Sequence, residues 1–288
     1  MIIIGCGYLG QKVASRYLKL NQGVVGVTRG TSVASALTNQ GLVEVSVDLD
    51  YLPLARIPMA GRSMFYFVPP PGAGRKDTRV RHLIEAFDSQ GAPIRLVYLS
   101  TTGVYGNCGG DWVTEERTPS PMADRACRRL DAERSLMAAC ANYGVELVIL
   151  RVAGIYGPGR LPIERLRNGV YVIREEEAPY TNRIHVDDLV TICMAAMQRG
   201  ESGGVYNVSD GHPTTMTDYF NKIADLYSLP RPLQIPLSEA PDRLSSGMLS
   251  YMRESRRLDN RRMREELQVT LRYPSLESGL RSCLVADT

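Results

Sequence analysis

The first ten residues carry a glycine pattern whose spacing suits the binding of a dinucleotide. Gly5, Gly7 and Gly10 form G-x-G-x-x-G directly after three isoleucines and before a stretch of helical character. In a strand–turn–helix unit, the first glycine permits a tight turn, the second lets the backbone approach a pyrophosphate, and the third lets helix and strand pack closely. The helix N-terminus also offers free N–H groups to phosphates. A turn without a ligand is the alternative interpretation. The predicted binding residues of this loop are Gly5, Gly7, Tyr8, Leu9 and Gly10.

The residues after the second expected strand indicate which dinucleotide would bind. Arg29 stands where an NAD site usually carries an acidic residue for the ribose 2′-hydroxyl, whereas an arginine accommodates a 2′-phosphate. Thr28 and Thr31 add hydrogen-bond donors. The pattern therefore favours NADP over NAD, and the alternative is that Arg29 is a solvated loop charge. Three residues after later strands are also expected to bind the cofactor: Asp48, Pro69 and Pro70. The alternative for Asp48 is that it caps a turn, and the alternative for the two prolines is that they form a rigid loop.

Short apolar runs alternate with amphipathic stretches, which predicts an α/β fold. The expected strands span residues 2–4, 24–28, 43–47, 64–68, 94–100, 146–151 and 204–208. The expected helices span residues 9–20, 32–40, 75–90, 122–143, 186–199, 216–227 and 259–267. This order indicates a Rossmann-type, doubly wound parallel sheet with a small C-terminal substrate-binding cap. We expect residues 1–155 plus 184–208 to form the dinucleotide-binding domain, and residues 156–183 plus 209–288 to form the cap.

Composition excludes several classes of protein. The 34 Lys+Arg and 31 Asp+Glu leave a formal net charge of +3, which argues against a nucleic-acid partner. No apolar run approaches the roughly 18 residues that span a bilayer, and the start lacks the charged region of a signal peptide. The six cysteines are scattered, without the spacing of metal ligands. We therefore expect reduced thiols, no metal, no membrane contact and a cytoplasmic location.

Four further segments, together with the glycine loop, resemble one known family. They span residues 99–106, 151–160, 182–188 and 205–208. In these segments and their order, the chain resembles the extended short-chain dehydrogenases/reductases, the nucleotide-sugar epimerase/dehydratase group, and especially its atypical branch. The resemblance covers nearly the whole chain. It implies a seven-stranded Rossmann-type sheet, a nicotinamide cofactor and a substrate cleft under a C-terminal cap, and it allows a homodimer.

The catalytic residues that the resemblance implies are only partly present. The family uses a Ser or Thr, a Tyr and a Lys, and Thr101 matches the first. Anchored on Glu133, the Tyr and Lys positions fall on Arg125 and Arg129, and residues 77–221 contain no lysine. Arginine stays protonated at any working pH, so neither can act as a general base. These arginines either bind a phosphate or carboxylate or form solvated ion pairs along the helix.

Two functional hypotheses remain open. One is an NADP(H)-dependent oxidoreductase or epimerase/dehydratase-like enzyme acting on a small polar substrate, with nucleotide sugars among the candidates. The other is a non-catalytic NADP(H)-binding sensor or interaction protein that has lost the Tyr/Lys pair. Thr101 and Tyr105 are the candidates for relaying a proton, although Tyr105 is also suited to packing. Asp187 and Asp188 are expected to cap the helix that begins beside them. The candidate substrate-binding residues are Arg125, Arg129, Tyr156, Arg160 and Arg183.

Overall fold

A seven-stranded parallel sheet forms the centre of the molecule. The computed structural model describes residues 1–30, 33–51 and 57–287. The strands lie in the order β12-β7-β5-β4-β1-β2-β3, so the winding direction reverses between β1 and β4. Ligands of doubly wound sheets bind at such a switch point. The predicted α/β Rossmann-type sheet is therefore confirmed. Its strands are β1 (Ile2–Ile4), β2 (Val25–Thr28), β3 (Val43–Ser46), β4 (Ser63–Tyr66), β5 (Arg95–Thr101), β7 (Glu146–Val152) and β12 (Val205–Val208).

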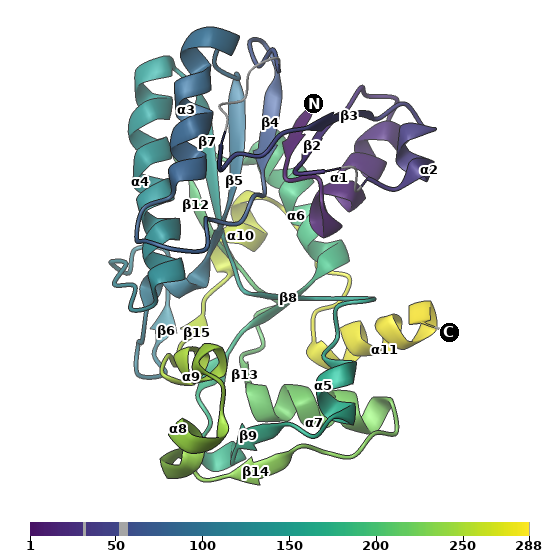
Figure 1. Cartoon of the computed structure of the whole chain (residues 1–288), viewed down its shortest axis with the longest axis vertical. Coiled ribbons are helices and arrows are strands. Elements are labelled where there is room, and N and C mark those ends of the chain that lie inside the picture. Colours follow the sequence, from purple (N-terminus) through teal and green to yellow (C-terminus); the bar gives the residue numbers. More distant parts are fainter. Residues whose placement is uncertain (31–32, 52–56, 288) are drawn as a thin grey trace.

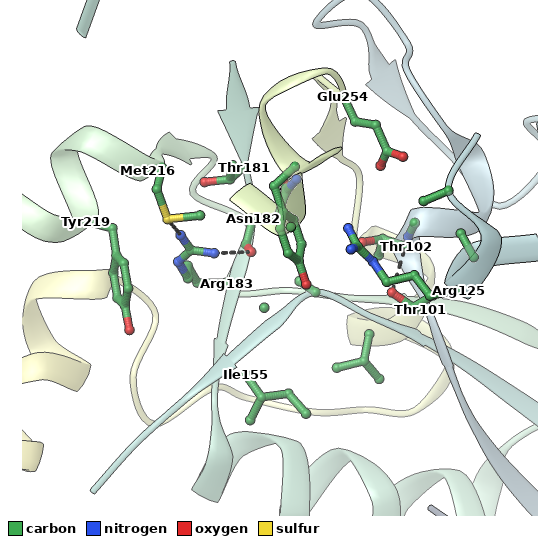
Figure 2. A pocket seen from close by; sticks show the side chains of 18 of the residues that line it. Thr101, Thr102, Arg125, Ile155, Thr181, Asn182, Arg183, Met216, Tyr219 and Glu254 are labelled. Carbon is green, nitrogen blue, oxygen red and sulfur yellow. Dashed lines mark hydrogen bonds between the residues drawn. The ribbon is translucent and has the colours of Figure 1, made fainter. Parts of the chain in front are cut away.

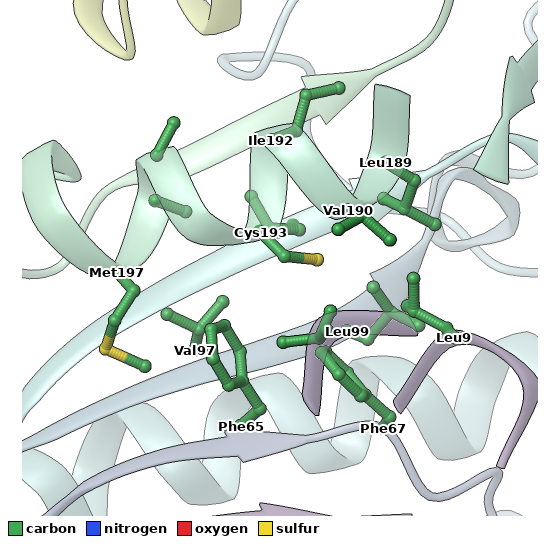
Figure 3. Packing of buried hydrophobic residues seen from close by; sticks show 14 of the residues in the cluster. Leu9, Phe65, Phe67, Val97, Leu99, Leu189, Val190, Ile192, Cys193 and Met197 are labelled. Carbon is green, nitrogen blue, oxygen red and sulfur yellow. The ribbon is translucent and has the colours of Figure 1, made fainter. Parts of the chain in front are cut away.

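Helices cover both faces of this sheet (Figure 1). One face packs against α1 (Tyr8–Lys19), α2 (Ser35–Thr38), α6 (Val186–Arg199) and α10 (Arg261–Glu266). The other face packs against α3 (Thr78–Gln90) and α4 (Asp124–Tyr143). In Figure 3, Val190 and Cys193 of α6 lie against the strand residues Phe65 and Val97, all buried. These β-branched and aromatic strand residues are buried from both sides, as a parallel sheet requires.

The cap lies beyond the carboxyl ends of the strands and has a core of its own, which includes Val172, Phe220 and Leu280. Its helices are α5 (Ile163–Arg167), α7 (Met216–Leu226), α8 (Ala240–Arg243), α9 (Ser246–Met252) and α11 (Leu276–Asp287). Short strands outside the central sheet form four two-stranded pairs: β6 (Trp112–Val113) with β15 (Arg257–Leu258), β8 (Gly154–Tyr156) with β11 (Arg183–His185), β9 (Tyr171–Ile173) with β14 (Leu233–Ile235), and β10 (Tyr180–Thr181) with β13 (Thr214–Thr215). The single-turn helices are η1 (Thr102–Tyr105), η2 (Glu175–Glu177) and η3 (Leu237–Glu239).

Three segments differ from the sequence-based expectations. Met263 and Leu267 are buried in the core that α1 and α6 share, so the segment around α10 packs on the sheet and not with the cap. Helix α11 was not among the expected helices, and it contains Gly279. That glycine lets the helix lie against the Tyr156 ring, since a Cβ there would come within 2.0 Å of the hydroxyl. The expected helix at 32–40 is shorter, and its first residue, like Thr31, lies outside the described residues.

Within the described ranges, no helix has the length and apolar character needed to cross a membrane.

Candidate cofactor and substrate site

A groove of about 550 Å³ lies at the switch point, where the glycine loop meets the ends of β2 and β4. Gly5 has φ +89°, and a Cβ on it would approach the Val68 nitrogen to 2.8 Å, so only glycine suits this turn. A Cβ on Gly7 would instead point into open space, with no described atom within 4 Å. The backbone of Gly7 therefore faces the groove at the start of α1. This arrangement fits a dinucleotide whose pyrophosphate lies on the loop and the helix N-terminus.

Most of the predicted cofactor residues line this groove. They are Gly5, Gly7, Tyr8, Leu9, Thr28, Arg29, Asp48 and Pro69. Gly10 lies beneath the loop, where a Cβ would meet the Gly5 oxygen at 2.7 Å. Pro70 lines the neighbouring cavity instead. The structure thus brings together residues from four separate strand ends, as the parallel arrangement of these strands requires.

The groove wall at the end of β2 combines a cation with nearby acids. Arg29 is exposed there, whereas Thr28 is buried, and its hydroxyl lies within hydrogen-bond distance of two acceptors, the Gly30 carbonyl and, at 3.2 Å, the Glu44 carboxylate. Glu44 also accepts the Val33 N–H at 3.3 Å. Sequence reasoning missed Glu44, because its position within β3 does not show that its side chain reaches the end of β2. Asp48 accepts the N–H of Asp50 at 3.0 Å and so holds a turn beside the groove.

The groove opens into a larger cavity of about 950 Å³ between the sheet and the cap. Four residues line both spaces: Leu99, Arg129, Ile155 and Arg160. Arg160 lies over the Tyr8 ring, with its Cζ 4.6 Å from the ring centroid, and the Tyr8 hydroxyl donates to the Pro158 carbonyl at 2.9 Å. These contacts attach the loop after β8 to the glycine loop, so the groove and the cavity form one continuous site.

The described residues that line the cavity carry a strong excess of positive charge. The charged residues among them are Arg125, Arg129, Arg160, Arg165, Arg183, Arg256 and Glu254. The single acid, Glu254, is already paired with Arg256 at 2.8 Å. Figure 2 shows Thr101 and Arg125 on one side of this cavity and Arg183, Met216 and Tyr219 on the other. An anionic ligand suits such a surface.

Thr101 lies at the end of β5 and lines the cavity together with Arg125 and Arg129. Its Oγ1 accepts the N–H of Gly103 at 3.2 Å, which leaves the hydroxyl proton available to a ligand. Arg125 stacks on the Tyr251 ring at 4.1 Å. Arg129 donates to the Val68 carbonyl at 3.1 Å and to the Tyr98 hydroxyl at 3.2 Å. Both arginines line the same cavity as Thr101, and Figure 2 shows Arg125 beside it.

Two tyrosines expected at the site are placed outside the cavity. Tyr105 is 1% exposed, and its hydroxyl donates to Asn207 at 2.7 Å and accepts from Arg151 at 3.0 Å. Burial raises the pKa of Tyr105 to about 12. Tyr156 is equally buried, beneath Gly279, and burial raises its pKa far above the ordinary range. Neither placement agrees with the predicted role, because the turn after β5 and the strand β8 direct these rings into the protein core.

Asp187 and Asp188 lie in the first turn of α6, but the N-cap of this helix differs from the expected one. Asp188 does not cap its own helix, because its carboxylate accepts the N–H groups of Arg272 at 2.7 Å and Tyr273 at 2.9 Å. It therefore holds the segment that leads to α11. The helix cap is His185, which accepts the N–H of Asp187 at 3.2 Å. Burial lowers the pKa of His185, consistent with a neutral, structural ring.

Comparisons with known proteins agree with this geometry. Residues 78–209 match the NAD dependent epimerase/dehydratase family. A 3-diazoavenalumate denitrifying reductase from Streptomyces sp is 28% identical over 227 residues, which cover 73% of each chain. A trifunctional UDP-glucose 4,6-dehydratase, epimerase and reductase from Arabidopsis thaliana is 23% identical over 158 residues, 51% of this chain, and the match spans only 24% of that protein's length.

Solved structures extend the similarity to the whole chain. A functionally unknown conserved protein from Silicibacter pomeroyi DSS has a TM-score of 0.83 and 28% identity, with 100% of this chain and 99% of that chain covered. MoeE5 in complex with UDP-glucose and NAD has a TM-score of 0.79 and 22% identity, with 99% and 97% covered. The match to the NAD dependent epimerase/dehydratase family thus lies within a fold that these solved structures share over nearly the whole chain.

Proposed function

We propose that this protein is an NADP(H)-dependent oxidoreductase or epimerase/dehydratase-like enzyme that acts on a small anionic substrate. The observation that carries the proposal is the continuity of the glycine-loop groove with a cationic cavity that contains Thr101. Nucleotide sugars remain candidate substrates, because MoeE5 and several other neighbours of the same fold bind them. The nicotinamide would lie where Leu99, Arg129, Ile155 and Arg160 line both spaces.

The residues of this chain would then orient the substrate and leave the hydride chemistry to the cofactor. Thr101 donates its hydroxyl proton to the substrate oxygen while its own oxygen accepts from Gly103. Arg129, fixed by the Val68 carbonyl and Tyr98, directs positive charge to the same place and stabilises negative charge that develops on that oxygen. Because both family positions for Tyr and Lys hold arginine, a water molecule supplies the proton in this proposal.

The cofactor preference depends on Arg29. In this proposal its exposed guanidinium binds the 2′-phosphate of NADP, and a charge-assisted hydrogen bond of this kind contributes about 1.5–3 kcal/mol. Arg29→Ala should weaken NADPH binding by roughly 10- to 100-fold and change NADH binding by less than about twofold. Calorimetric titration of both nucleotides against both proteins measures this. Equal losses for NADPH and NADH would show that Arg29 does not recognise the 2′-phosphate.

The role of Thr101 can be tested separately from cofactor binding. Thr101→Val keeps the shape of the side chain but removes its hydroxyl, so NADPH should bind as before while turnover falls by about 100-fold or more. The readout is nicotinamide absorbance during a screen of nucleotide sugars and small keto or hydroxy acids. Arg165→Gln, at an exposed position of the same cavity, serves as the matched control. Unchanged turnover in Thr101→Val would remove this residue from the mechanism.

A non-catalytic NADP(H)-binding protein is the second candidate. It is favoured by Arg125 and Arg129, which occupy the family's Tyr and Lys positions and are held by Tyr251, Val68 and Tyr98. A protein of this kind would bind NADPH tightly, and no substrate would change the nicotinamide absorbance. Substrate-dependent oxidation of NADPH, lost in Thr101→Val, would exclude it.

A further inference from the structure

One arginine of the cavity is buried without an acidic partner. Arg183, the first residue of β11, is 8% exposed and lines the cavity. Among the ion pairs of the described residues, none includes it. Removing a charge from water without a compensating group opposes folding. Stability alone therefore does not explain a guanidinium at this position.

The hydrogen bonds of Arg183 leave one edge of its guanidinium without a strong acceptor. Nη1 donates to the Asn182 carbonyl at 3.5 Å, and Nη2 faces the Met216 sulfur at 3.3 Å. Nε has no partner. Figure 2 shows the guanidinium between Asn182 and Met216, with Tyr219 beside it. A thioether is a weak acceptor, so the Nε–Nη2 edge, which matches two carboxylate oxygens, has no acceptor of matching strength.

The surrounding elements hold this guanidinium in place. Gly154 of β8 pairs with Arg183, and a Cβ on Gly154 would come within 2.6 Å of Nη1. Glycine at this position therefore makes the room that the guanidinium occupies. Tyr219 of α7 lies on the other side, with its ring centroid 4.2 Å from the arginine Cζ. Strand β8 and the cap helix α7 thus fix the side chain before any ligand binds, which reduces the conformational entropy lost on binding.

We propose that Arg183 is a carboxylate-binding subsite, at which the substrate's carboxylate displaces the Met216 sulfur from the Nε–Nη2 edge. The proposal rests on the proposed function, because it names the class of substrate that the same cavity accepts. One carboxylate neutralises one guanidinium, and its two oxygens match the two N–H groups. Methionine is unbranched and adapts readily, so its displacement needs no backbone movement.

Charge favours a carboxylate over a phosphate at this place. Asp210 is 4% exposed and interacts electrostatically with Arg183 without forming an ion pair with it. A multiply charged phosphate would be repelled by this carboxylate and only partly neutralised by one guanidinium. The other groups that act on Arg183 electrostatically are the tyrosines 156, 219 and 251. The guanidinium edge therefore suits one planar carboxylate group, such as either end of a dicarboxylate, more than a multiply charged phosphate.

The test is calorimetric titration of the full chain with two probes, malonate and inorganic pyrophosphate, at constant ionic strength. The wild-type protein should bind malonate more tightly than pyrophosphate. Arg183→Gln should weaken malonate binding by about tenfold or more, whereas Arg165→Gln, which changes an exposed arginine of the same cavity, should alter it by less than about twofold. Arg183→Lys keeps the positive charge but removes the two parallel N–H groups of the Nε–Nη2 edge, so this variant should also bind malonate less tightly than wild type. Gly154→Ala should weaken binding by displacing the guanidinium.

Three results would overturn the proposal: no malonate binding by the wild-type protein, equal losses in Arg183→Gln and Arg165→Gln, or preferred binding of pyrophosphate that depends on Arg183. Titration of NADPH against the same variants reports on the proposed function separately. Malonate binding that depends on Arg183, in a protein that binds no NADPH, would leave the subsite in place and reject the proposed cofactor. Normal NADPH binding without malonate binding would reject the subsite alone.

Discussion

Arg151 and Arg183 are both buried, but the protein neutralises them in different ways. Arg151, 4% exposed on β7, donates to both oxygens of Glu133, at 2.8 and 3.2 Å, and to the Tyr105 hydroxyl at 3.0 Å. Arg183 donates to a carbonyl, faces a thioether and an aromatic ring, and forms no ion pair with Asp210, whose charge acts on it from farther away. The guanidinium of Arg151 is neutralised and hydrogen-bonded within the fold, whereas Nε of Arg183 has no acceptor. The buried arginine at the cavity wall thus differs from the one in the core in how fully its N–H groups are hydrogen-bonded.

The Arg151 network also explains how Thr101 is held. Glu133 of α4 accepts the hydroxyl of Ser100 as well as the two bonds from Arg151. These contacts connect the ends of β5 and β7 to the helix that carries Arg125 and Arg129. Because Ser100 directly precedes Thr101, the network fixes the strand end from which Thr101 meets the cavity. A satisfied polar network of this kind makes the platform rigid, while Arg183 remains open to a ligand.

The largest effect on stability should come from breaking the buried Arg151–Glu133 ion pair. Arg151→Met leaves the Glu133 carboxylate buried and uncompensated, so the free energy of unfolding should fall by about 3–5 kcal/mol. Urea denaturation at pH 7, followed by circular dichroism, measures the loss. A decrease smaller than about 1 kcal/mol would mean that the network does not stabilise the fold, and the contrast with Arg183 would then lose its basis.

The sequence predicted the sheet and the groove well because short-range patterns specify both. Buried parallel strands are continuous apolar runs, and all seven expected strands overlap the observed ones. The groove is built mainly from backbone and from strand ends, so the glycine spacing and the strand order are enough to bring Gly7 and Arg29 together. The turn requires glycine at position 5 because of its positive φ and the close Val68 backbone. This requirement makes the motif recognisable from the sequence alone.

The cavity was less predictable because it is built from side chains of distant segments. Arg183 was expected at the substrate site, but nothing in the sequence shows that Gly154 makes room for it or that no acid pairs with it. Tyr105 was expected beside the cofactor, yet its partners, Arg151 and Asn207, come from two other strands and draw the hydroxyl into the core. A motif gives the position of a residue along a strand, whereas the tertiary contacts decide where its side chain ends.

Asp210 offers the next test, because it is a buried carboxylate that Arg183 does not neutralise. Burial raises the pKa of Asp210 to about 6, from its ordinary value of 3.8. Between these values the folded state binds more protons than the unfolded state, so this group makes the protein less stable as the pH rises from about 4 to 6. Asp210→Asn removes that cost and keeps an oxygen for the His212 N–H. The variant should equal wild type near pH 3 and be more stable by about 3 kcal/mol at pH 7.

Urea denaturation of both proteins across this pH range measures the difference. A constant difference between Asp210→Asn and wild type at every pH would mean that the carboxylate does not titrate differently in the folded state. A variant that is less stable at pH 7 would mean that Asp210 is compensated after all, with Arg183 as the nearest candidate for that role.

The smallest effect should come from Arg183 itself, and this is what separates it from Arg151. Arg183→Met replaces an uncompensated buried charge with an apolar side chain of similar length, so the free energy of unfolding should change by less than about 1 kcal/mol or increase. Because the Arg183 charge lowers the pKa of Asp210, that pKa should rise further in the variant. Urea denaturation beside Arg151→Met gives the matched comparison, and the Asp210 carboxyl can be followed by NMR. If both methionine variants lose several kcal/mol, Arg183 is a structural arginine like Arg151. If only Arg151→Met loses stability, the fold does not depend on the Arg183 charge, as expected of a residue whose role is to bind an anion.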